Sequence, residues 1–380
     1  LRASLRPLVR RLPRDRRLIA FGTGSNHFTD NAAYLYLHMS RDTDVRCVWI
    51  SGSRRIAARL EGLGLDAAYR WSVDGVITSL RASWYVFSGY RSDINVWLSH
   101  GATAFTLWHG VGIKRLRADA GVPSAAMYSA PAGSWTARLF ADERLPPDWV
   151  LSSSSLMSSK FAVDFGVTEA RCLEFGYPRN DHLVAGGKPP EQLVDPDVYR
   201  TLEQKRPVVG YFPTFRDNMV SLPVDDTDLS EMGKIIGEQG GVLLFKPHRY
   251  STIPATSRGS LVVLPSSVDL NAHLDLCDVL ITDYSSVAFD FLLLGRPVIL
   301  FRPDFEHFRS GRGFFLDPTE MMPGILSCSK SNLFDILRDV DAIPVPENLE
   351  SLRDLFWGAS AQPGASQRVA DFILDSLQRS

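Results

Sequence analysis

Short apolar runs alternate with helix-like stretches along most of this chain, and this alternation constrains the fold more than any other feature. Strand-like runs such as RLIAF, VRCVWIS and WYVFSG are separated by helix-like stretches such as NAAYLYLHM and RIAARLEGL. Apolar strands joined by helices are typical of a parallel sheet that is buried on both faces. The sequence therefore predicts an α/β fold with helices on both sides of each sheet.

A polar, proline-containing stretch from residue 185 to residue 197 interrupts this alternation, and the pattern resumes after it. The strand-like runs of the second half are PVVGYFP, GVLLFKP, SLVVLP, DVLIT and PVILF. A chain of 380 residues is also longer than one compact core of common size. We therefore expect two Rossmann-like domains that face each other across a cleft, the first over residues 18–190 and the second over residues 191–380. Ligands of such proteins bind outside the carboxyl ends of the strands.

Composition excludes several classes of function. The formal net charge of -2 argues against a dedicated nucleic-acid-binding protein. The apolar runs are all shorter than the roughly 18 residues that a membrane-spanning helix needs. The stretch GTGSNH at Gly22 lacks the third glycine of a dinucleotide-binding fingerprint, and the acidic residues and cysteines are too dispersed for a metal site. We therefore expect neither a metal nor an organic cofactor.

The first 17 residues, LRASLRPLVRRLPRDRR, form a separate basic segment. The apolar residues that would share one stripe of a helix are Leu1, Leu5, Leu8, Val9 and Leu12. A basic amphipathic segment of this type can bind an anionic membrane surface. Because Pro7 and Pro13 disfavour a continuous helix, a frayed basic tail is the alternative. The chain begins with leucine rather than methionine, so we expect it to be part of a longer protein.

The segment ITDYSSVAFDFLLLG, which begins at Ile281, combines an apolar strand, a small polar turn and an apolar helix. Asp283 lies at the corner, and Ser285 and Ser286 lie where the helix begins with its first amide hydrogens unpaired. Such N–H groups, the positive end of the helix dipole and two hydroxyls favour a bound phosphate. The alternative is structural, with one serine capping the helix and Asp283 belonging to the turn.

Other polar residues also follow strand-like runs, at their predicted carboxyl ends. In the first half they are Asn26, His27, His109, Lys114 and Arg179. In the second half they are Thr214, Arg216, Lys246 and His248. The carboxyl ends of parallel strands lie at one edge of a sheet, so each set is expected to gather there. We assign Asn26, His27 and Lys114 to the acceptor side of a site for a phosphorylated substrate.

Among these residues, His109 is the candidate general base. It follows an apolar run, Trp108 would limit its contact with solvent, and Gly110 lets a ligand or another backbone approach closely. An imidazole titrates near neutral pH, so it can take the proton of a hydroxyl as the oxygen attacks. The alternative is a core histidine whose ring nitrogens bind backbone groups.

Lys246 and His248 flank Pro247, so their side chains point the same way in an extended chain and could reach one phosphate. Arg216 could add a bidentate contact, and Arg179 could approach from the first domain. For each arginine taken alone, a surface salt bridge is the commoner explanation. Phosphoryl transfer depends mainly on positive charge and hydrogen-bond donors, and this set supplies both.

Five motifs occur in order along the chain: WHGVGIK, GYPRND, YFPTFRD, LFKPH and ITDYSSVAFDF. Together they resemble the CDP-glycerol glycerophosphotransferase family, which includes teichoic acid primases and polymerases and related capsule polymerases. The early segment FGTGSNHFTDNAAYLYLHM is similar to the first βα unit of that family. The resemblance spans residues 21–301.

This resemblance implies a two-domain fold of the glycosyltransferase-B type. It implies that the second domain binds a CDP-activated alditol, whose alditol phosphate is transferred to an acceptor hydroxyl with release of CMP. His109 would be the base on the acceptor. The phosphates of the donor would be held by His248, Asp283, Ser285 and Ser286. Supporting contacts would come from Thr214, Arg216, Lys246 and Arg179.

The resemblance also implies the partners and the location of the protein. Acceptors in the family are lipid-linked saccharides or growing polyol-phosphate polymers, so we expect a peripheral enzyme on the cytoplasmic face of the cell membrane. The basic first segment fits this location. WHGVGIK and LFKPHRY are variants of the usual family motifs, and the motifs do not distinguish glycerol from ribitol or another alditol.

Two other functions fit the same pattern. A nucleotide-sugar glycosyltransferase or epimerase that uses UDP- or CMP-activated sugars would have the same architecture. A protein that binds a membrane surface or a polymer could keep the fold without activity. The candidate base and the candidate anion site together favour the transferase.

Overall fold

The computed structural model describes residues 2–41, 44–115, 145–214, 224–247, 256–311, 313–322, 324–327 and 329–379. The chain divides into two compact units. Unit 1 comprises Leu1–Gly110, Pro131–Ala185 and Trp357–Ser380, and unit 2 comprises Val111–Ala130 and Gly186–Phe356. This division differs from the expected one in three places, because Val111–Ala130 and residues 186–190 belong to unit 2 and Trp357–Ser380 returns to unit 1.

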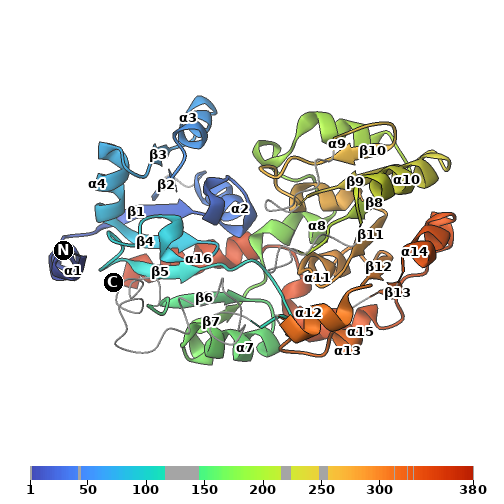
Figure 1. Ribbon diagram of the computed structural model, residues 1–380. Helices are drawn as coiled ribbons and strands as arrows, with labels where there is room; N and C mark the ends of the chain where they lie inside the picture. The colour runs from blue at the N-terminus through green and yellow to red at the C-terminus, as the bar shows by residue number, and fades with distance from the viewer. Residues whose placement is uncertain are drawn as a thin grey trace. The chain divides into compact units, whose positions relative to one another are not determined.

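Unit 1 is built on a parallel sheet of seven strands in the order β3-β2-β1-β4-β5-β6-β7 (Figure 1). The strands are β1 (Asp15–Gly22), β2 (Arg46–Ser51), β3 (Ala67–Tyr69), β4 (Ala82–Phe87), β5 (Thr103–Thr106), β6 (Trp149–Ser152) and β7 (Cys172–Glu174). In the middle of the sheet, Phe21 of β1 pairs with Trp49 on one side and with Val86 on the other. These central strands are buried on both faces, as their continuous apolar sequences predict.

The longer helices of unit 1 are α1 (Arg2–Arg11), α2 (Asp30–Met39), α3 (Arg54–Gly62), α4 (Val73–Arg81), α7 (Ser155–Phe165), α8 (Asp181–Ala185) and α16 (Ala365–Arg379). Short 3-10 turns are η1 (Gly24–Asn26), η2 (Arg91–Asp93), η5 (Glu169–Arg171), η6 (Pro178–Asn180) and η10 (Gly358–Ala361). Serine caps fix three of the helix starts, because the side chains of Ser53, Ser72 and Ser154 each accept a backbone N–H of the first turn. Gly166 ends α7 in the left-handed conformation that glycine adopts without strain.

The last described helix, α16, contacts the rest of unit 1 at its start and at its middle. The carboxylate of Asp181 accepts the backbone N–H groups of Gly364, Ala365 and Ser366 at 2.7–3.0 Å. Further along the helix, the ring of Phe372 packs edge-on against the rings of Trp84, Phe105 and Trp149, which lie on β4, β5 and β6. The final helix of the chain therefore covers the sheet formed by the first half.

Unit 2 is built on a second parallel sheet of six strands in the order β10-β9-β8-β11-β12-β13. The strands are β8 (Val208–Tyr211), β9 (Val242–Phe245), β10 (Leu261–Val263), β11 (Val279–Thr282), β12 (Val298–Phe301) and β13 (Ile325–Ser327). The helices are α9 (Pro196–Glu203), α10 (Asp226–Gly237), α11 (Val287–Leu292), α12 (Phe305–Gly311), α13 (Pro318–Met321), α14 (Lys330–Leu337) and α15 (Leu349–Phe356). The 3-10 turns are η7 (Glu191–Leu193), η8 (Asn271–Leu276) and η9 (Val340–Ala342).

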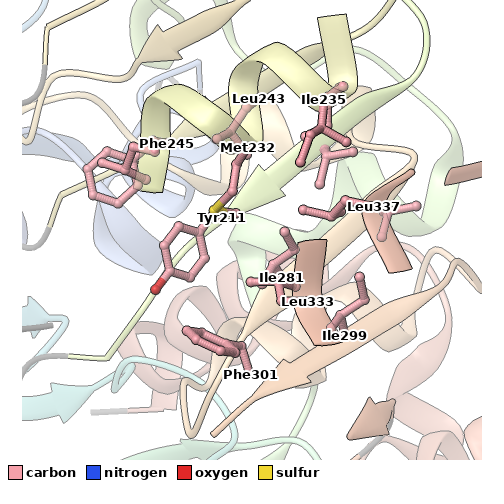
Figure 2. Close-up of a cluster of buried hydrophobic side chains, with 14 of the residues drawn as sticks. Tyr211, Met232, Ile235, Leu243, Phe245, Ile281, Ile299, Phe301, Leu333 and Leu337 are labelled. Carbon is pink, nitrogen blue, oxygen red and sulfur yellow. The ribbon is translucent and has the colours of Figure 1, made fainter. Parts of the chain in front are cut away.

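The core of unit 2 lies between one face of this sheet and the helices α10 and α14. Figure 2 shows Tyr211, Ile281 and Phe301 of three neighbouring strands on the same side as Met232 of α10 and Leu333 of α14. Ile281 pairs in register with Tyr211 and with Ile299, so the apolar side chains of adjacent strands lie side by side. Burial of this continuous apolar layer is the main source of stability of such a unit.

Both sheets reverse their strand order near the centre, between β1 and β4 in unit 1 and between β8 and β11 in unit 2. In open α/β sheets, ligands bind outside the carboxyl ends of the strands at this point of reversal. The predicted α/β class with parallel sheets is confirmed. Within the described stretches, every helix is too short or too polar to pass through a lipid bilayer.

Candidate functional site

At the carboxyl edge of the sheet in unit 1, three loops bring Asp30, His109 and Arg179 together. Asp30 is the first residue of α2, which follows β1. His109 lies three residues beyond the end of β5, and Arg179 lies in η6, which follows β7. The three residues therefore come from separate parts of the sequence but from the same edge of the sheet.

The contacts among these three residues are direct. Nδ1 of His109 lies 2.7 Å from Oδ2 of Asp30. The guanidinium of Arg179 donates through one terminal nitrogen to Oδ1 of Asp30 and through the other to the backbone carbonyl of His109, both at 2.8 Å. Each carboxylate oxygen of Asp30 thus has its own cationic or N–H partner.

Charge keeps Asp30 ionised. Burial alone would raise the pKa of the Asp30 carboxyl, but the Arg179 guanidinium and the hydrogen bond with His109 outweigh it and lower the pKa from 3.8 to about 2. The side chain of Arg179 is only 7% exposed, so solvent screens this ion pair weakly. His109 differs, because 47% of its side chain is exposed. The imidazole is therefore accessible to a substrate and is not a core histidine.

Asn31 fixes the backbone around the three residues. Its side-chain nitrogen donates to the carbonyl of Trp108 at 2.9 Å, and its side-chain oxygen accepts the backbone N–H of Arg179 at 3.2 Å. Asn31 is fully buried, so these contacts connect the loops that follow β5 and β7 to the start of α2. The Asn31 amide therefore helps to hold His109 and Arg179 in their relative positions.

Strained backbone is concentrated at the same edge. Among the described residues, the non-glycine positions with positive φ are Asn26 (57°), Asp30 (65°) and Trp108 (51°). Such conformations are unfavourable for residues other than glycine, and they persist where surrounding contacts hold them. Two of the three adjoin or contact His109, which indicates that the loops are shaped around the imidazole.

The second ring nitrogen of His109, Nε2, faces Gly89, which follows β4. A Cβ at position 89 would lie 3.3 Å from Nε2 and 3.2 Å from Oδ2 of Asp93. Asp93 also accepts the backbone N–H of Gly89 at 2.8 Å, which fixes this stretch of chain. Glycine at position 89 therefore avoids the close contacts with Nε2 and with Asp93 that any larger residue would make.

The other residues that the sequence assigned to the acceptor side make different contacts. Asn26 accepts the backbone N–H of Gly52 at 2.8 Å and so connects the loops after β1 and β2. His27 follows η1 directly and is partly buried. Lys114 forms an antiparallel bridge with Phe314 and belongs to unit 2, not to the unit that holds His109.

In unit 2, Asp283 joins the ends of the two central strands. Its carboxylate accepts the backbone N–H of Thr214 at 2.9 and 3.1 Å and that of Tyr284 at 2.5 Å, and its side chain is buried. Oγ of Ser285 accepts the N–H of Val287 at 3.4 Å. Ser286 is the residue that precedes α11. Thr214, Asp283, Ser285 and Ser286 therefore do lie at the point where the strand order reverses.

Lys246 follows β9, and its ammonium group lies against the turn after β10. It donates to the backbone carbonyls of Pro265, Ser266 and Val268. Burial lowers the pKa of Lys246 to about 8, although the carboxylate of Asp269 opposes this shift. These contacts stabilise the turn after β10. To bind a phosphate, the ammonium group of Lys246 would have to give up at least one of these carbonyl contacts. The predicted site residues Arg216 and His248 lie outside the described residues.

The sequence analysis missed Asp30, Asn31, Gly89 and Asp93. The only local signal was the Asp-Asn pair where an apolar strand is followed by a helix, and that pair also fits a simple helix start. Arg179 was expected at a phosphate, but its described contacts connect it to Asp30 and to the His109 backbone. Sequence reasoning thus identified the edge of the sheet and the histidine, whereas the groups around the histidine required the fold.

The architecture defines the class of this protein as an α/β protein with two parallel sheets. A family profile described as CDP-Glycerol:Poly(glycerophosphate) glycerophosphotransferase matches residues 4–375. The chain belongs to this family, so the resemblance noted in the five motifs is confirmed.

Known relatives agree with this assignment. The chain is 25% identical to the teichoic acid glycerol-phosphate transferase of Staphylococcus aureus over 96% of this chain and 95% of that protein. It is 27% identical to the teichoic acid poly(glycerol phosphate) polymerase of Staphylococcus epidermidis over 92% of this chain and 49% of that protein, so it spans about half of that polymerase. The solved structure of the wall teichoic acid polymerase TagF matches with a TM-score of 0.76 and 24% identity, over 96% of this chain and 90% of that chain. The last comparison concerns the fold alone.

Proposed function

We propose that this protein transfers an alditol phosphate, such as glycerol phosphate or ribitol phosphate, from a CDP-alditol to an acceptor hydroxyl and releases CMP. The observation that carries this proposal is the half-exposed imidazole of His109, whose Nδ1 binds an ionised carboxylate and whose Nε2 lies beside Gly89. A base held in this way at a ligand-binding edge is suited to deprotonate a hydroxyl. The S. aureus relative named as a glycerol-phosphate transferase supports the same class of reaction.

In the proposed reaction, Nε2 of His109 accepts the proton of the acceptor hydroxyl as the hydroxyl oxygen attacks the phosphorus that carries the alditol. The bond from that phosphorus to the bridging oxygen of the diphosphate breaks, and CMP leaves with this oxygen. The transferred phosphorus keeps its alditol and gains the acceptor oxygen. Catalysis then depends on positioning and on charge stabilisation around the phosphates.

The donor side of the proposal lies in unit 2. Ser285, Ser286 and the adjoining amides at the start of α11 would bind donor phosphate, and Asp283 would hold the backbone of Thr214 and Tyr284 beside it. His248, Arg216 and Lys246 complete the proposed donor set, with the two Rossmann-like units facing each other as in glycosyltransferase-B enzymes. TagF structures described after soaking with CDPG are consistent with a donor of this type in the fold.

The acceptor and the location are also proposals. We place the acceptor, a lipid-linked saccharide or a growing polyol-phosphate polymer, at the cytoplasmic face of the cell membrane. The support is α1, which presents Leu8 at 63% and Leu12 just beyond it at 41% exposure beside the exposed Arg10 and Arg11. Exposed leucines beside arginines suit an anionic membrane surface.

The test of the reaction is CMP release from CDP-glycerol or CDP-ribitol in the presence of a lipid-linked or oligomeric acceptor. His109→Ala should reduce kcat by at least about 10²-fold while donor binding stays intact, because the variant loses the base but not the donor site. His307→Ala is the matched control, since His307 is an exposed histidine on α12. Full turnover in His109→Ala would remove His109 from the mechanism, and CMP release from neither donor would reject the proposed substrate class.

A further inference from the structure

The contact between Asp30 and His109 determines which ring nitrogen carries a proton. An ionised carboxylate only accepts hydrogen bonds, so the 2.7 Å contact requires the hydrogen on Nδ1 of His109. In a neutral imidazole, Nε2 then has the free lone pair. Nε2 is the nitrogen that lies beside Gly89, on an imidazole whose side chain is 47% exposed to solvent.

Arg179 makes this arrangement rigid. Its planar guanidinium donates to Oδ1 of Asp30 and to the backbone carbonyl of His109. One side chain therefore holds both residues of the Asp30–His109 contact in place. The backbone N–H of Asn31 also binds Oδ1 of Asp30, at 2.7 Å. The carboxylate therefore has few ways to rotate away from the ring.

We propose that Asp30 is a positioning residue for the transfer reaction, which sets the tautomer and the orientation of His109 and stabilises the imidazolium that forms when Nε2 takes the acceptor proton. Arg179 acts one step further out and keeps Asp30 ionised and in place. This inference rests on the proposed function, because it assigns Asp30 a role through the base. It extends that function to a carboxylate that lies 79 residues from the histidine in sequence.

The test is Asp30→Asn, assayed by CMP release. Asparagine tolerates the positive φ of position 30 and has the same shape, so the variant removes the charge and leaves the backbone conformation available. We expect kcat to fall by about 10²-fold or more with the KM for the donor unchanged, because donor contacts are not altered. Asp74→Asn is the matched control, since Asp74 is an exposed aspartate in the first turn of another helix of unit 1.

A measurement that does not depend on enzymatic activity tests the inference even if the Asp30→Asn variant does not fold. Long-range ¹H–¹⁵N spectra of histidine-labelled protein, assigned with His109→Ala, report which nitrogen of His109 is protonated. The wild-type protein should show Nδ1–H, and Asp30→Asn should show a mixture of tautomers. A wild-type Nε2–H tautomer overturns the inference.

The outcomes also separate this inference from the proposed function. If neither CDP-glycerol nor CDP-ribitol releases CMP, the proposed function is wrong whatever the tautomer. If His109→Ala retains full turnover, His109 is not the base, and the positioning role of Asp30 is wrong with it. If His109→Ala is inactive but Asp30→Asn keeps the wild-type kcat, the base is right and the positioning role of Asp30 is wrong. Loss of kcat in both variants, with Asp74→Asn unaffected, supports both.

Discussion

At the scale of single residues, the function of a side chain here depends on partners that are distant in sequence. His109 could be chosen from the sequence because it follows an apolar run and precedes a glycine. Its partner Asp30 is 79 residues away, and Arg179 is 70 residues from the histidine carbonyl that it binds. Local patterns carry no information on such pairs, which is why the histidine could be predicted from the sequence and its partners could not.

Lys246 is a residue whose partner the local sequence pattern predicted differently from what the structure shows. A lysine after an apolar strand suggested a phosphate ligand, but its ammonium group donates to carbonyls of the turn that contains Pro265 and Ser266. Residue type alone does not decide between a ligand and the protein's own carbonyls as the partner of a buried ammonium. The partner of Lys246 is set by the turn that follows β10, the strand that neighbours β9 in the sheet.

Asp283 provides a prediction at this scale. Asp283→Asn replaces one carboxylate oxygen with an NH₂ group that would face the N–H groups of Thr214 and Tyr284, and it also removes the charge. We expect the free energy of unfolding to fall by about 1–3 kcal/mol. Urea-induced unfolding followed by circular dichroism measures this change, and isothermal titration with CDP-glycerol should show weaker donor binding.

Asp335→Asn is the control for that measurement. Asp335 is an exposed residue of α14 that pairs with Arg338 one helical turn away. Its substitution should change the free energy of unfolding by no more than about 0.5 kcal/mol. Equal unfolding midpoints for wild type and Asp283→Asn would show that the buried carboxylate contributes nothing to the ends of β8 and β11.

At the scale of elements, the alternation of apolar runs and helix-like stretches predicted the strands well. RLIAF, VRCVWIS, WYVFSG, DVLIT and PVILF all contribute strands of the two sheets. The first segment was open between a helix and a frayed tail, and the structure has the helix α1 in spite of Pro7. Pro7 is the sixth residue of α1, beyond the first turn, so its missing N–H removes one hydrogen bond from the interior of this helix.

The helix α1 presents two kinds of surface, which refines the membrane proposal. Val9 is buried against unit 1, and the guanidinium of Arg14 donates to the carbonyls of Ser79, Ala82 and Leu98. Leu8 and Leu12 are exposed. Deletion of the whole segment would therefore disturb the fold, whereas substitution of the two leucines tests membrane binding alone.

The double substitution Leu8→Ser with Leu12→Ser should weaken co-sedimentation with phosphatidylglycerol vesicles by about tenfold or more, because two leucines no longer enter the interface. Binding of the wild type should also decrease as salt is raised, since arginines supply part of the attraction. Val163→Ser is the control, because Val163 is 74% exposed on α7 of the same unit. Unchanged vesicle binding in the double variant would assign attachment to another surface.

At the scale of the whole molecule, two parallel sheets were predictable because each half repeats the strand pattern. The division of the chain was less predictable, because the sequence suggested one boundary near residue 190 whereas Trp357–Ser380 returns to unit 1. The return depends on contacts of Asp181 with the start of α16 and of Phe372 with Trp149. The apolar face of an amphipathic helix such as α16 predicts that the helix packs against a sheet. The sequence of the helix does not indicate which of the two sheets it covers.

The identity of the donor can be tested on the complete protein. A ligand that binds only the folded state stabilises it by RT ln(1 + [L]/Kd), which is about 2.7 kcal/mol at a hundredfold excess over Kd. CDP-glycerol, CDP-ribitol or CMP should therefore raise Tm in a concentration-dependent manner, and the same shift should be seen in His109→Ala. If UDP-activated sugars raise Tm and cytidine nucleotides do not, the nucleotide-sugar alternative replaces the CDP-alditol.

The return of α16 to the first sheet has a consequence for biosynthesis. The seven strands of that sheet emerge from the ribosome well before α16, with Gly186–Phe356 of unit 2 translated in between. Until α16 has been synthesised, the rings of Trp84, Phe105 and Trp149 lack the cover that Phe372 provides. Maturation of the unit that carries His109 is thereby coupled to synthesis of α16, and a nascent chain arrested before α16 would expose an aromatic surface to chaperones.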